Sequence, residues 1–154
     1  MDNKKVALRK TQNFGRAVFA RKRIKKGEVI AVFDGPIFDD IFDGWTEDLH
    51  NHAIQIGPRE WRDSAGIARY VNHSCDPNCG IKNRIKIVAM RTIEPGEQIT
   101  FDYEMTEKST WWRMRCRCGS PLCRGKIGNY ARMPKALRAK YKGYISEWLI
   151  KPKS

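Results

Sequence analysis

The stretch from Arg69 to Asn78 constrains the fold of this chain more than any other. It reads Arg-Tyr-Val-Asn-His-Ser-Cys-Asp-Pro-Asn, so five polar, hydrogen-bonding side chains follow one another from Asn72 to Asp76. Such a run makes a poor core strand and a poor helix interior, and Pro77 favours an extended or turn conformation in the residue before it. Taken alone, the stretch fits an ordinary turn with a capping asparagine. Two further segments give it a more specific meaning.

The first of these segments is rich in cysteine. Cys116, Cys118 and Cys123 follow a C-x-C-x4-C spacing. Three thiolates this close suit a tetrahedral zinc site that lacks one ligand. Cys75 and Cys79 are the candidates for the fourth. Because five cysteines are an odd number and the spacing favours metal over disulfides, we expect a reducing, intracellular compartment.

The second segment runs from Gly96 to Tyr103 and reads Gly-Glu-Gln-Ile-Thr-Phe-Asp-Tyr, a turn that leads into a β-rich run. In chain order, Asn-His-Ser-Cys-x-Pro-Asn, Gly-Glu-x-Ile-x-Phe-Asp-Tyr and Cys-x-Cys-x4-Cys resemble the motifs of SET-domain protein lysine methyltransferases with a post-SET zinc loop. The resemblance covers roughly Val6 to Tyr130. It implies a mainly β fold of several small sheets, with a knot-like passage of the C-terminal segment through a loop of earlier chain.

The resemblance also divides the chain into three parts. Residues 6–106 would form the SET domain, residues 107–130 the post-SET zinc loop, and residues 131–154 a basic C-terminal helix and tail. The chain of 154 residues is long enough to bury one core without disulfides. Pro134 to Ile150 predicts one amphipathic helix, whose apolar stripe would be Leu137, Tyr141, Tyr144, Ile145, Trp148 and Leu149.

Two stretches share the pattern Ile-x-x-Gly-Glu-x-Ile, at residues 24–30 and 93–99. Each predicts a tight turn that feeds a strand, with glycine free to adopt a positive φ. Because no third copy exists, we expect two similar hairpins and not a repeat protein. Between them, residues 37–49 are expected to be irregular and residues 50–56 to form a strand.

Charge is distributed unevenly along the chain. The formal net charge of +13 is typical of proteins that bind nucleic acid or another polyanion. Residues 1–30 carry ten Lys and Arg against two acids, and residues 132–154 carry seven against one. Residues 31–66, the acidic insert, carry eight acids against two arginines. We therefore expect the insert to attract a basic substrate, through Asp39, Asp40, Asp43, Glu47 and Asp48.

The resemblance implies S-adenosylmethionine as the methyl donor. The family's Gly-x-Gly loop, which cradles this cofactor, has Ala17 in place of its second glycine here. His52 stands where relatives offer an aromatic residue, although a lone histidine also fits a packed or exposed side chain. Ile127 or Tyr130 would close over the adenine. The residues implied to contact the cofactor are Phe14, Gly15, Arg16, Ala17, His52, Asn72, His73 and Ile127.

Tyr103 is the implied catalytic residue, with its hydroxyl at the reacting methyl and amine. The lysine channel would contain Phe33, where many relatives carry tyrosine, and Phe101. A phenylalanine at position 101 leaves room for a methylated amine, which implies di- or trimethylation, while the missing hydroxyl at position 33 leaves the number open.

The family's zinc site supplies the ligand that spacing alone left undecided. Cys75 matches the family's fourth ligand and would join Cys116, Cys118 and Cys123. Zinc on these four thiolates would tie the C-terminal loop down over the cofactor site. Cys79 would then be a free thiol or a packing residue.

The sequence therefore predicts an S-adenosylmethionine-dependent protein-lysine N-methyltransferase that acts on a basic protein segment, such as one of a histone or ribosomal protein. The alternative is a catalytically silent SET-like module that binds basic peptides or nucleic acid, which Ala17 and Phe33 favour. A small zinc-bearing nucleic-acid-binding protein would explain the charge and the cysteines, but not Tyr103 together with Asn72 and His73.

The partners and the compartment follow from the same features. The basic ends of the chain are candidates for contact with nucleic acid. No run of 18 apolar residues occurs and no apolar segment follows the charged N-terminus, so we expect no membrane span and no secretory signal. The expected location is the cytoplasm in a prokaryote or the nucleus in a eukaryote.

Overall fold

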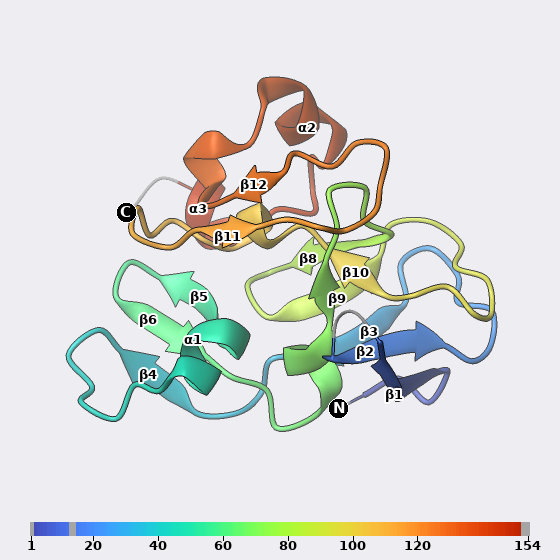
Figure 1. Cartoon of the computed structure of the whole chain (residues 1–154), viewed down its shortest axis with the longest axis horizontal. Coiled ribbons are helices and arrows are strands. Elements are labelled where there is room, and N and C mark those ends of the chain that lie inside the picture. The colour runs from blue at the N-terminus through green and yellow to red at the C-terminus, as the bar shows by residue number, and fades with distance from the viewer. Residues whose placement is uncertain (1, 13–14, 152–154) are drawn as a thin grey trace.

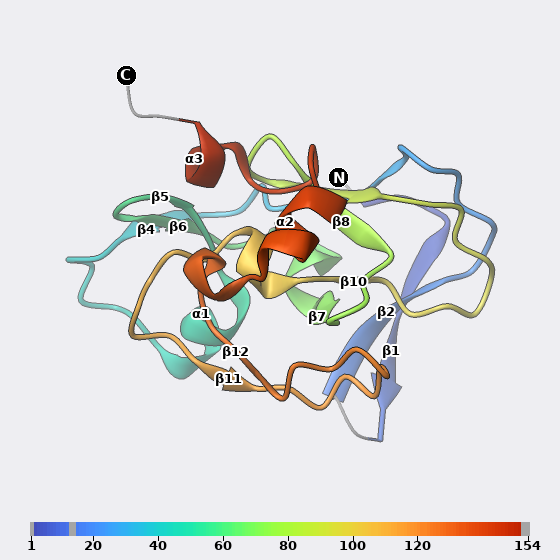
Figure 2. The same cartoon turned by 90° about the horizontal axis from the view of Figure 1, so that it is seen from above.

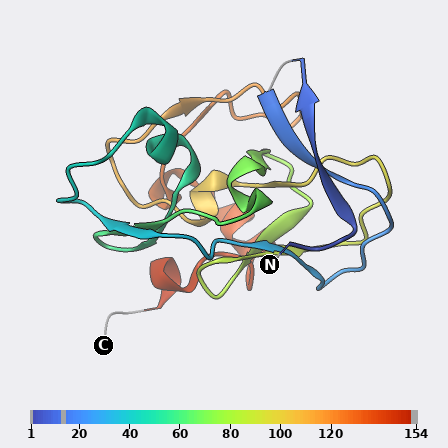
Figure 3. The same cartoon turned by 90° about the horizontal axis from the view of Figure 1, so that it is seen from below.

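The computed structural model describes residues 2–12 and 15–151 and is mainly β (Figure 1). Its strands form three two-stranded and two three-stranded sheets in the described residues, and the helices are short. The expectation of several small sheets is therefore confirmed. The β1–β2 hairpin and the β4–β6–β5 sheet lie at opposite ends of the molecule in all three views (Figures 1, 2 and 3).

The N-terminal hairpin pairs β1 (Val6–Thr11) with β2 (Gly15–Ala20) in antiparallel register. β2 turns Ala17, Val18 and Ala20 into the interior, which holds this hairpin against the core. Phe14 lies outside the described residues, so its contact with a cofactor stays a prediction.

The central sheet has the antiparallel order β3 (Val29–Val32), β9 (Lys86–Ala89) and β8 (Cys79–Lys82). Apolar residues from all three strands form the main core, in which the Cys79 side chain on β8 is completely buried. This sheet is the support on which the remaining segments pack.

The two Ile-x-x-Gly-Glu-x-Ile stretches face each other across one end of this core. Ile24 and Ile93 exchange backbone hydrogen bonds of 2.9 Å in both directions. Gly27 and Gly96 have φ of +93° and +92°, a conformation that glycine adopts without a steric penalty. The shared sequence pattern thus produces two equivalent turns.

The acidic insert forms the sheet β4 (Ile37–Asp39), β6 (Glu60–Arg62) and β5 (Ile54–Gly57), together with helix α1 (Glu47–His52). The expectation of an irregular segment followed by a strand from residue 50 was wrong. Thr46 caps the helix because its Oγ1 accepts the Leu49 N–H at 3.2 Å, and the acids of the first turn favour the positive end of the helix dipole.

The polar stretch at the centre of the sequence crosses the middle of the fold. A 3₁₀ turn (Ile67–Tyr70) leads into β7 (Asn72–His73), which pairs in parallel with β10 (Thr100–Phe101). A second 3₁₀ turn (Tyr103–Met105) follows β10 directly. The central motif and the strand before Tyr103 are therefore neighbours, as expected, while the knot-like passage stays a prediction.

The C-terminal part covers one side of the central sheet (Figure 1). It contains the antiparallel pair β11 (Met114–Arg115) and β12 (Lys126–Ile127), a 3₁₀ turn (Tyr130–Arg132) and the helices α2 (Lys135–Lys140) and α3 (Glu147–Ile150). None of the helices within residues 2–12 and 15–151 is long and apolar enough to cross a membrane.

The prediction of a single helix over residues 134–150 was wrong, because this segment forms two short helices. Gly143, with φ +89°, lies in a turn that separates α2 from α3. This break allows Tyr141 and Ile145 to be buried in the main core. Trp148 is anchored separately, because its indole N–H points at the carbonyl oxygens of Gln55 and Thr106, each at 3.2 Å. Tertiary packing has overridden the helical pattern.

Candidate active site

A polar pocket of about 420 Å³ opens beside β2, β7 and β11. Residues from five separate segments line it, among them Gly15, Arg16, His52, Asn72, Tyr103 and Met114. Four of the residues implied to contact a cofactor are thus brought together. Ala17 and Ile127 are not among the residues that line this pocket, because both side chains are completely buried.

The polar pocket holds two arginines that are able to pair with an anionic group of a ligand. Gly15 has φ +66°, and a Cβ there would meet no atom within 4 Å, so glycine is needed for its backbone conformation and not for space. Arg16 and Arg113 line the pocket, and neither forms an ion pair within the part of the chain that the structure describes. Asn72 Nδ2 donates to Arg16 O at 3.3 Å and to Gln98 Oε1 at 3.1 Å, which fixes the amide at the pocket wall.

His52 lies at the edge of this pocket. Its Nδ1 is 2.8 Å from Asp48 O, and its ring stands edge-on to Tyr70 with centroids 5.6 Å apart. These contacts hold the ring in place from the last turn of α1.

A second, narrower hollow lies next to the polar pocket, and we call it the aromatic channel. It is lined largely by apolar and aromatic residues, including Phe33, Val71, Phe101, Tyr103 and Trp112. Phe33 and Phe101 are both about 1% exposed. The two residues expected in a lysine channel therefore share one cavity.

The polar pocket and the aromatic channel have a common wall. Five residues line both hollows: Asn51, His52, Arg69, Tyr103 and Trp112. A ligand in the polar pocket and a side chain in the channel would therefore meet at this wall. Trp112 was not among the residues expected from the sequence, because nothing in its local pattern distinguishes it from an apolar anchor.

Tyr103 is held from two directions. Its hydroxyl donates to Val71 O at 2.7 Å, and its backbone N–H donates to His73 Nδ1 at 3.0 Å. Burial raises the pKa of the Tyr103 hydroxyl well above its usual value, and the contact with His73 only partly opposes this. The phenol therefore remains protonated at neutral pH and acts as a hydrogen-bonding group, not as a base.

The imidazole of His73 is turned into the interior, with its side chain 2% exposed. Because Nδ1 accepts the Tyr103 N–H, the neutral ring carries its proton on Nε2, which lies 3.3 Å from Cys75 Sγ. Burial, assisted by the charge of Arg124, lowers the pKa of His73 to about 3. The structure thus gives this side chain a positioning contact with Tyr103 and Cys75, and its contact with a cofactor stays a prediction.

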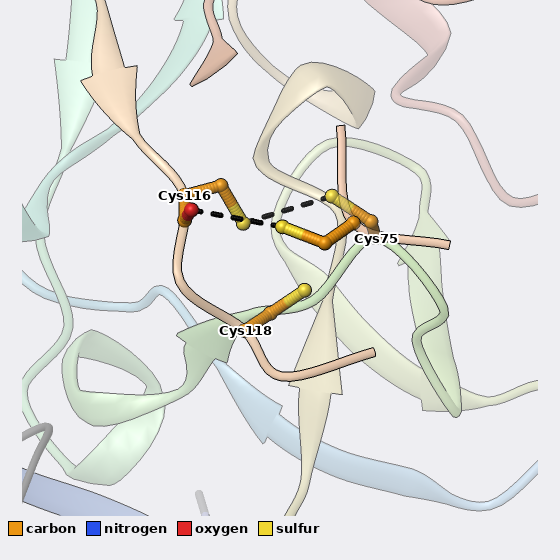
Figure 4. Close-up of side chains that lie close together, drawn as sticks. Cys75, Cys116 and Cys118 are labelled. Atoms are coloured by element: carbon orange, nitrogen blue, oxygen red, sulfur yellow. Dashed lines mark hydrogen bonds between the residues drawn. The ribbon is translucent and has the colours of Figure 1, made fainter. Parts of the chain in front are cut away.

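Four sulfur atoms gather where the C-terminal loop meets the central motif. The Sγ atoms of Cys75, Cys116, Cys118 and Cys123 all lie within 4.8 Å of one another, and Figure 4 shows those of Cys75, Cys116 and Cys118 turned toward one another. The Cys75–Cys116 distance is 3.6 Å. A tetrahedron with zinc–sulfur bonds of about 2.3 Å has edges of about 3.8 Å, so this set fits zinc. Cys79 is not part of the cluster.

Apolar side chains close the cysteine cluster on its inner side. Ile127, on β12, packs against Cys75 and Cys116, and Trp112 and Met114 pack against the same group. The implied contact of Ile127 with adenine stays a prediction, whereas its packing against the cysteines was not expected.

Arg124 joins the cysteine loop to the strand that carries Tyr103. Its Nη2 lies 2.8 Å from Asp102 Oδ2 and 2.9 Å from Glu104 Oε1, and both carboxylates are almost completely buried. Burial raises the pKa of Asp102 to about 6, although the attraction of Arg124 opposes this rise. No local pattern in the sequence indicates this contact, because Arg124 and Glu104 are 20 residues apart.

Comparisons with known proteins agree with this geometry. Residues 15–104 match the family model described as the SET domain. The chain is 30% identical over 149 residues to histone-lysine N-methyltransferase ash1 of Drosophila melanogaster, which covers 84% of the chain and 6% of that protein. It is 27% identical to histone-lysine N-methyltransferase ASHR3 of Arabidopsis thaliana over 151 residues, 87% of the chain and 30% of that protein.

Another relative has a higher sequence identity over a shorter part of the chain. The H3 lysine-4 specific histone-lysine N-methyltransferase of Saccharomyces cerevisiae is 46% identical over 68 residues, which is 39% of the chain and 6% of that protein. The chain thus spans between 6% and 30% of the length of these three relatives.

Among solved structures, KRYPTONITE in complex with mCHG DNA and SAH superimposes with a TM-score of 0.65. The match has 23% sequence identity and covers 79% of the chain and 28% of that protein, so it supports the fold alone. The family model covers more than half of the chain, and the matched part contains Tyr103 and most of the residues that line the polar pocket and the aromatic channel. The chain belongs to the SET-domain family.

Proposed function

We propose that this protein is an S-adenosylmethionine-dependent protein-lysine N-methyltransferase. The observation that carries this proposal is the common wall at Tyr103, where a polar pocket fit for the cofactor meets an aromatic channel fit for one lysine side chain. Methyl transfer needs donor and acceptor in line and shielded from water, and such positioning can contribute ~7–11 kcal/mol at its extreme.

The polar pocket would hold the cofactor through its charged and polar ends. Arg16 or Arg113 would pair with its carboxylate, and the Asn72 amide would bind its amino-acid part. Gly15 would border the cofactor with its backbone in a conformation that glycine adopts freely. When bound, S-adenosylmethionine supplies an electrophilic methyl group on a positively charged sulfur.

The aromatic channel would prepare the lysine amine. A free lysine has a pKa of about 10.4, so the amine must lose its proton to become a nucleophile. Phe33, Phe101 and Val71 line the channel with apolar surface that would exclude water around the side chain, and desolvation lowers the pKa of a buried ammonium. The proton can therefore leave to solvent as the side chain enters, and no strong protein base is required.

Tyr103 would orient the reacting groups with its hydroxyl. Val71 O and the His73 ring hold this tyrosine in one position, and its raised pKa keeps the hydroxyl protonated. Phe101, with its ring centroid 5.0 Å from that of Tyr103, adds no polar group there, so a methylated amine would be free to rotate and react again. We therefore infer di- or trimethylation.

Zinc on Cys75, Cys116, Cys118 and Cys123 would supply a structural cross-link. The loop from residue 116 to residue 123 would then be fixed against the central motif, next to the polar pocket. Metal would act here by positioning, since four thiolates leave no open coordination site for chemistry.

The substrate we propose is a lysine in a basic protein segment, with histones and ribosomal proteins as candidates. The printed names of the relatives refer to histone lysines, and the acidic insert complements a basic chain. We also propose an intracellular location, nuclear in a eukaryote. Contact of the basic ends with nucleic acid stays a prediction.

The test is methyl transfer from radiolabelled S-adenosylmethionine to a panel of histones and ribosomal proteins. Wild-type protein should label at least one of them on lysine, and Tyr103→Phe should lose nearly all turnover while cofactor affinity, measured by calorimetry, stays within a few-fold. A wild-type protein that binds the cofactor but labels nothing would support a silent binding module. A Tyr103→Phe variant with wild-type rate would make this tyrosine structural.

A further inference from the structure

A third hollow, of about 260 Å³, lies on the acidic insert beside the aromatic channel. Four of the five tryptophans of the chain line it, and we call it the tryptophan pocket: Trp45, Trp61, Trp111 and Trp112, with His50, Asp40 and Glu107. This concentration is not explained by the core, because Trp111 is 61% exposed. An exposed tryptophan that lines a concave surface is a common feature of binding sites.

The rings of the tryptophan pocket are fixed at well-defined angles. Trp45 stacks on His50 with centroids 4.9 Å apart, and Trp61 stands edge-on to Trp45 at 5.7 Å. Trp111 stands edge-on to His50 at 5.5 Å. The Trp45 indole N–H donates to Asp39 O at 2.9 Å, which anchors that ring. These contacts fix the orientation of the aromatic rings before any ligand binds.

The chemistry of this surface favours a cation. The face of an indole carries negative charge and attracts cations more strongly than the other aromatic rings do. Asp40 and Glu107 add carboxyl groups to the wall, where Arg59 pairs with Asp40 and burial raises the pKa of Glu107 to about 7. Within the described residues, Asp39, Asp43 and Glu47 on the same insert have no ion-pair partner, so the local field is negative in a protein of net charge +13.

Arginine fits this environment better than lysine. Its planar guanidinium stacks on aromatic rings, is weakly hydrated and stays charged at every relevant pH. An arginine already lies beside this pocket, because Arg59 Nε is 3.0 and 2.9 Å from the two carboxylate oxygens of Asp40, a residue that lines it.

The tryptophan pocket and the aromatic channel are neighbours. His50, Ala53, Glu107 and Trp112 line both hollows. A peptide that inserts a lysine into the channel would therefore carry its adjacent residues over the tryptophan pocket, since each extended residue spans only about 3.3–3.6 Å. We propose that the tryptophan pocket binds the side chain of an arginine that lies within a few residues of the target lysine in the same substrate.

The proposal rests on the proposed function for its substrate, but its binding step can be tested without catalysis. The side-chain N–H signals of the five tryptophans are followed by NMR in the full chain, with each assigned by a Trp→Phe variant. Nα-acetyl-arginine amide is added, and the neutral isostere Nα-acetyl-citrulline amide serves as its control. The arginine probe should shift the signals of Trp45, Trp111 and Trp112 but not that of Trp148, which is buried elsewhere.

Three results in this titration would overturn the proposal. The first is no shift with the arginine probe, and the second is an equal shift with citrulline, which would mean that charge is not recognised. The third is tighter binding of the lysine or trimethyllysine amide than of the arginine amide, which would make the pocket specific for an ammonium.

A kinetic experiment then tests whether the arginine belongs to the substrate. Peptides that the enzyme methylates are compared with versions in which a single nearby arginine is replaced by citrulline. In the wild-type enzyme the replacement should raise KM by roughly 2- to 30-fold, the range expected of one cation–π contact. In Trp111→Ala the KM ratio of the two peptides should fall to about 1.

The matched control is Ile41→Ala, since Ile41 is 75% exposed on the same insert and does not line the pocket. This variant should keep the wild-type KM ratio. A Trp111→Ala enzyme that keeps that ratio would exclude the pocket from substrate binding even where the free arginine probe binds. If no peptide is methylated, the proposed function fails, while the NMR result still decides the binding step.

Discussion

Replacing Arg124 by methionine should destabilise the protein in a pH-dependent way. The methionine keeps the apolar stem of the side chain but removes the charge that lies 2.8 Å from Asp102 Oδ2 and 2.9 Å from Glu104 Oε1. Those two side chains are 0% and 1% exposed, so the variant leaves two carboxylates buried without a cation. Breaking a buried ion pair in this way costs about 3–5 kcal/mol. That cost is a large fraction of the ~5–15 kcal/mol by which a domain is stable.

The sign of the pH dependence follows from Asp102. Burial raises its pKa from 3.8 to about 6 in the folded protein, so the folded state keeps a proton that the unfolded chain releases. The proton on Asp102 therefore makes the free energy of unfolding of the wild type fall as pH rises from about 4 to about 6. Above that pH, Asp102 causes no further change. Without Arg124 the pKa of Asp102 rises further. The variant should thus continue to lose stability above pH 6.

Urea unfolding of the metal-loaded proteins, followed by tryptophan fluorescence, measures this difference at pH 6.0 and 8.5. The deficit of Arg124→Met should be larger at the higher pH, and metal content measured beforehand excludes a loss of zinc as its cause. Lys126→Met is the matched control, because Lys126 lies two residues further along the chain, at the start of β12, where it is exposed and has no ion pair within the described residues. A deficit below about 1 kcal/mol, or one equal at both pH values, would refute the account of Arg124 as the partner of two buried charges.

Three further changes test other parts of the site. Phe101→Tyr adds a hydroxyl near Tyr103 and should shift the products toward monomethyl-lysine in mass spectra. Unchanged di- or trimethylation would show that this ring does not limit the number of methyl groups added. Cys75→Ser should leave the protein with less than stoichiometric zinc, whereas Cys79→Ser should not, and normal zinc in the first variant would disprove the ligand set. Three acids of the insert have no ion-pair partner in the part of the chain that the structure describes, and their reversal to lysine should raise KM for a basic peptide at about 0.01 M salt. The rise should be smaller at about 0.15 M, because the Debye length falls from ~30 to ~8 Å. An unchanged KM at low salt would show that these acids do not attract the substrate. The acids are Asp39, Asp43 and Glu47.

The site residues that could be predicted from the sequence are those that stand in short, unusual motifs. Tyr103 and Asn72 stand in runs that no simple strand or helix explains, and the structure places both at the polar pocket. The ligand set of Cys75 with the three clustered cysteines depended on the family resemblance, because spacing alone left Cys79 equally suitable. The four sulfur atoms are indeed together.

The parts that the sequence did not reveal depend on contacts between distant segments. The 134–150 pattern predicts one helix, yet burying Tyr141 and Ile145 in the core required a break at Gly143. Helix α1 could have been found, because Thr46 followed by two acids is a typical helix start. The pairing of Arg124 with Asp102 had no such signal, since charge partners far apart in sequence leave no periodic pattern.

The burial of Cys79 gives this protein an internal marker that distinguishes unfolding of the core from release of the C-terminal loop. Cys79 is 0% exposed on β8, and burial raises its pKa far above that of a free thiol, so a thiol reagent cannot reach a thiolate there while the central sheet is intact. The other four of the five cysteines lie in the sulfur cluster. Cys75 and Cys116 are buried too, so removing metal should make the four cluster thiols reactive only where it also releases the C-terminal loop, and melting the core should expose the fifth. Counting modified cysteines by mass would separate release of the C-terminal loop from unfolding of the domain, molecule by molecule.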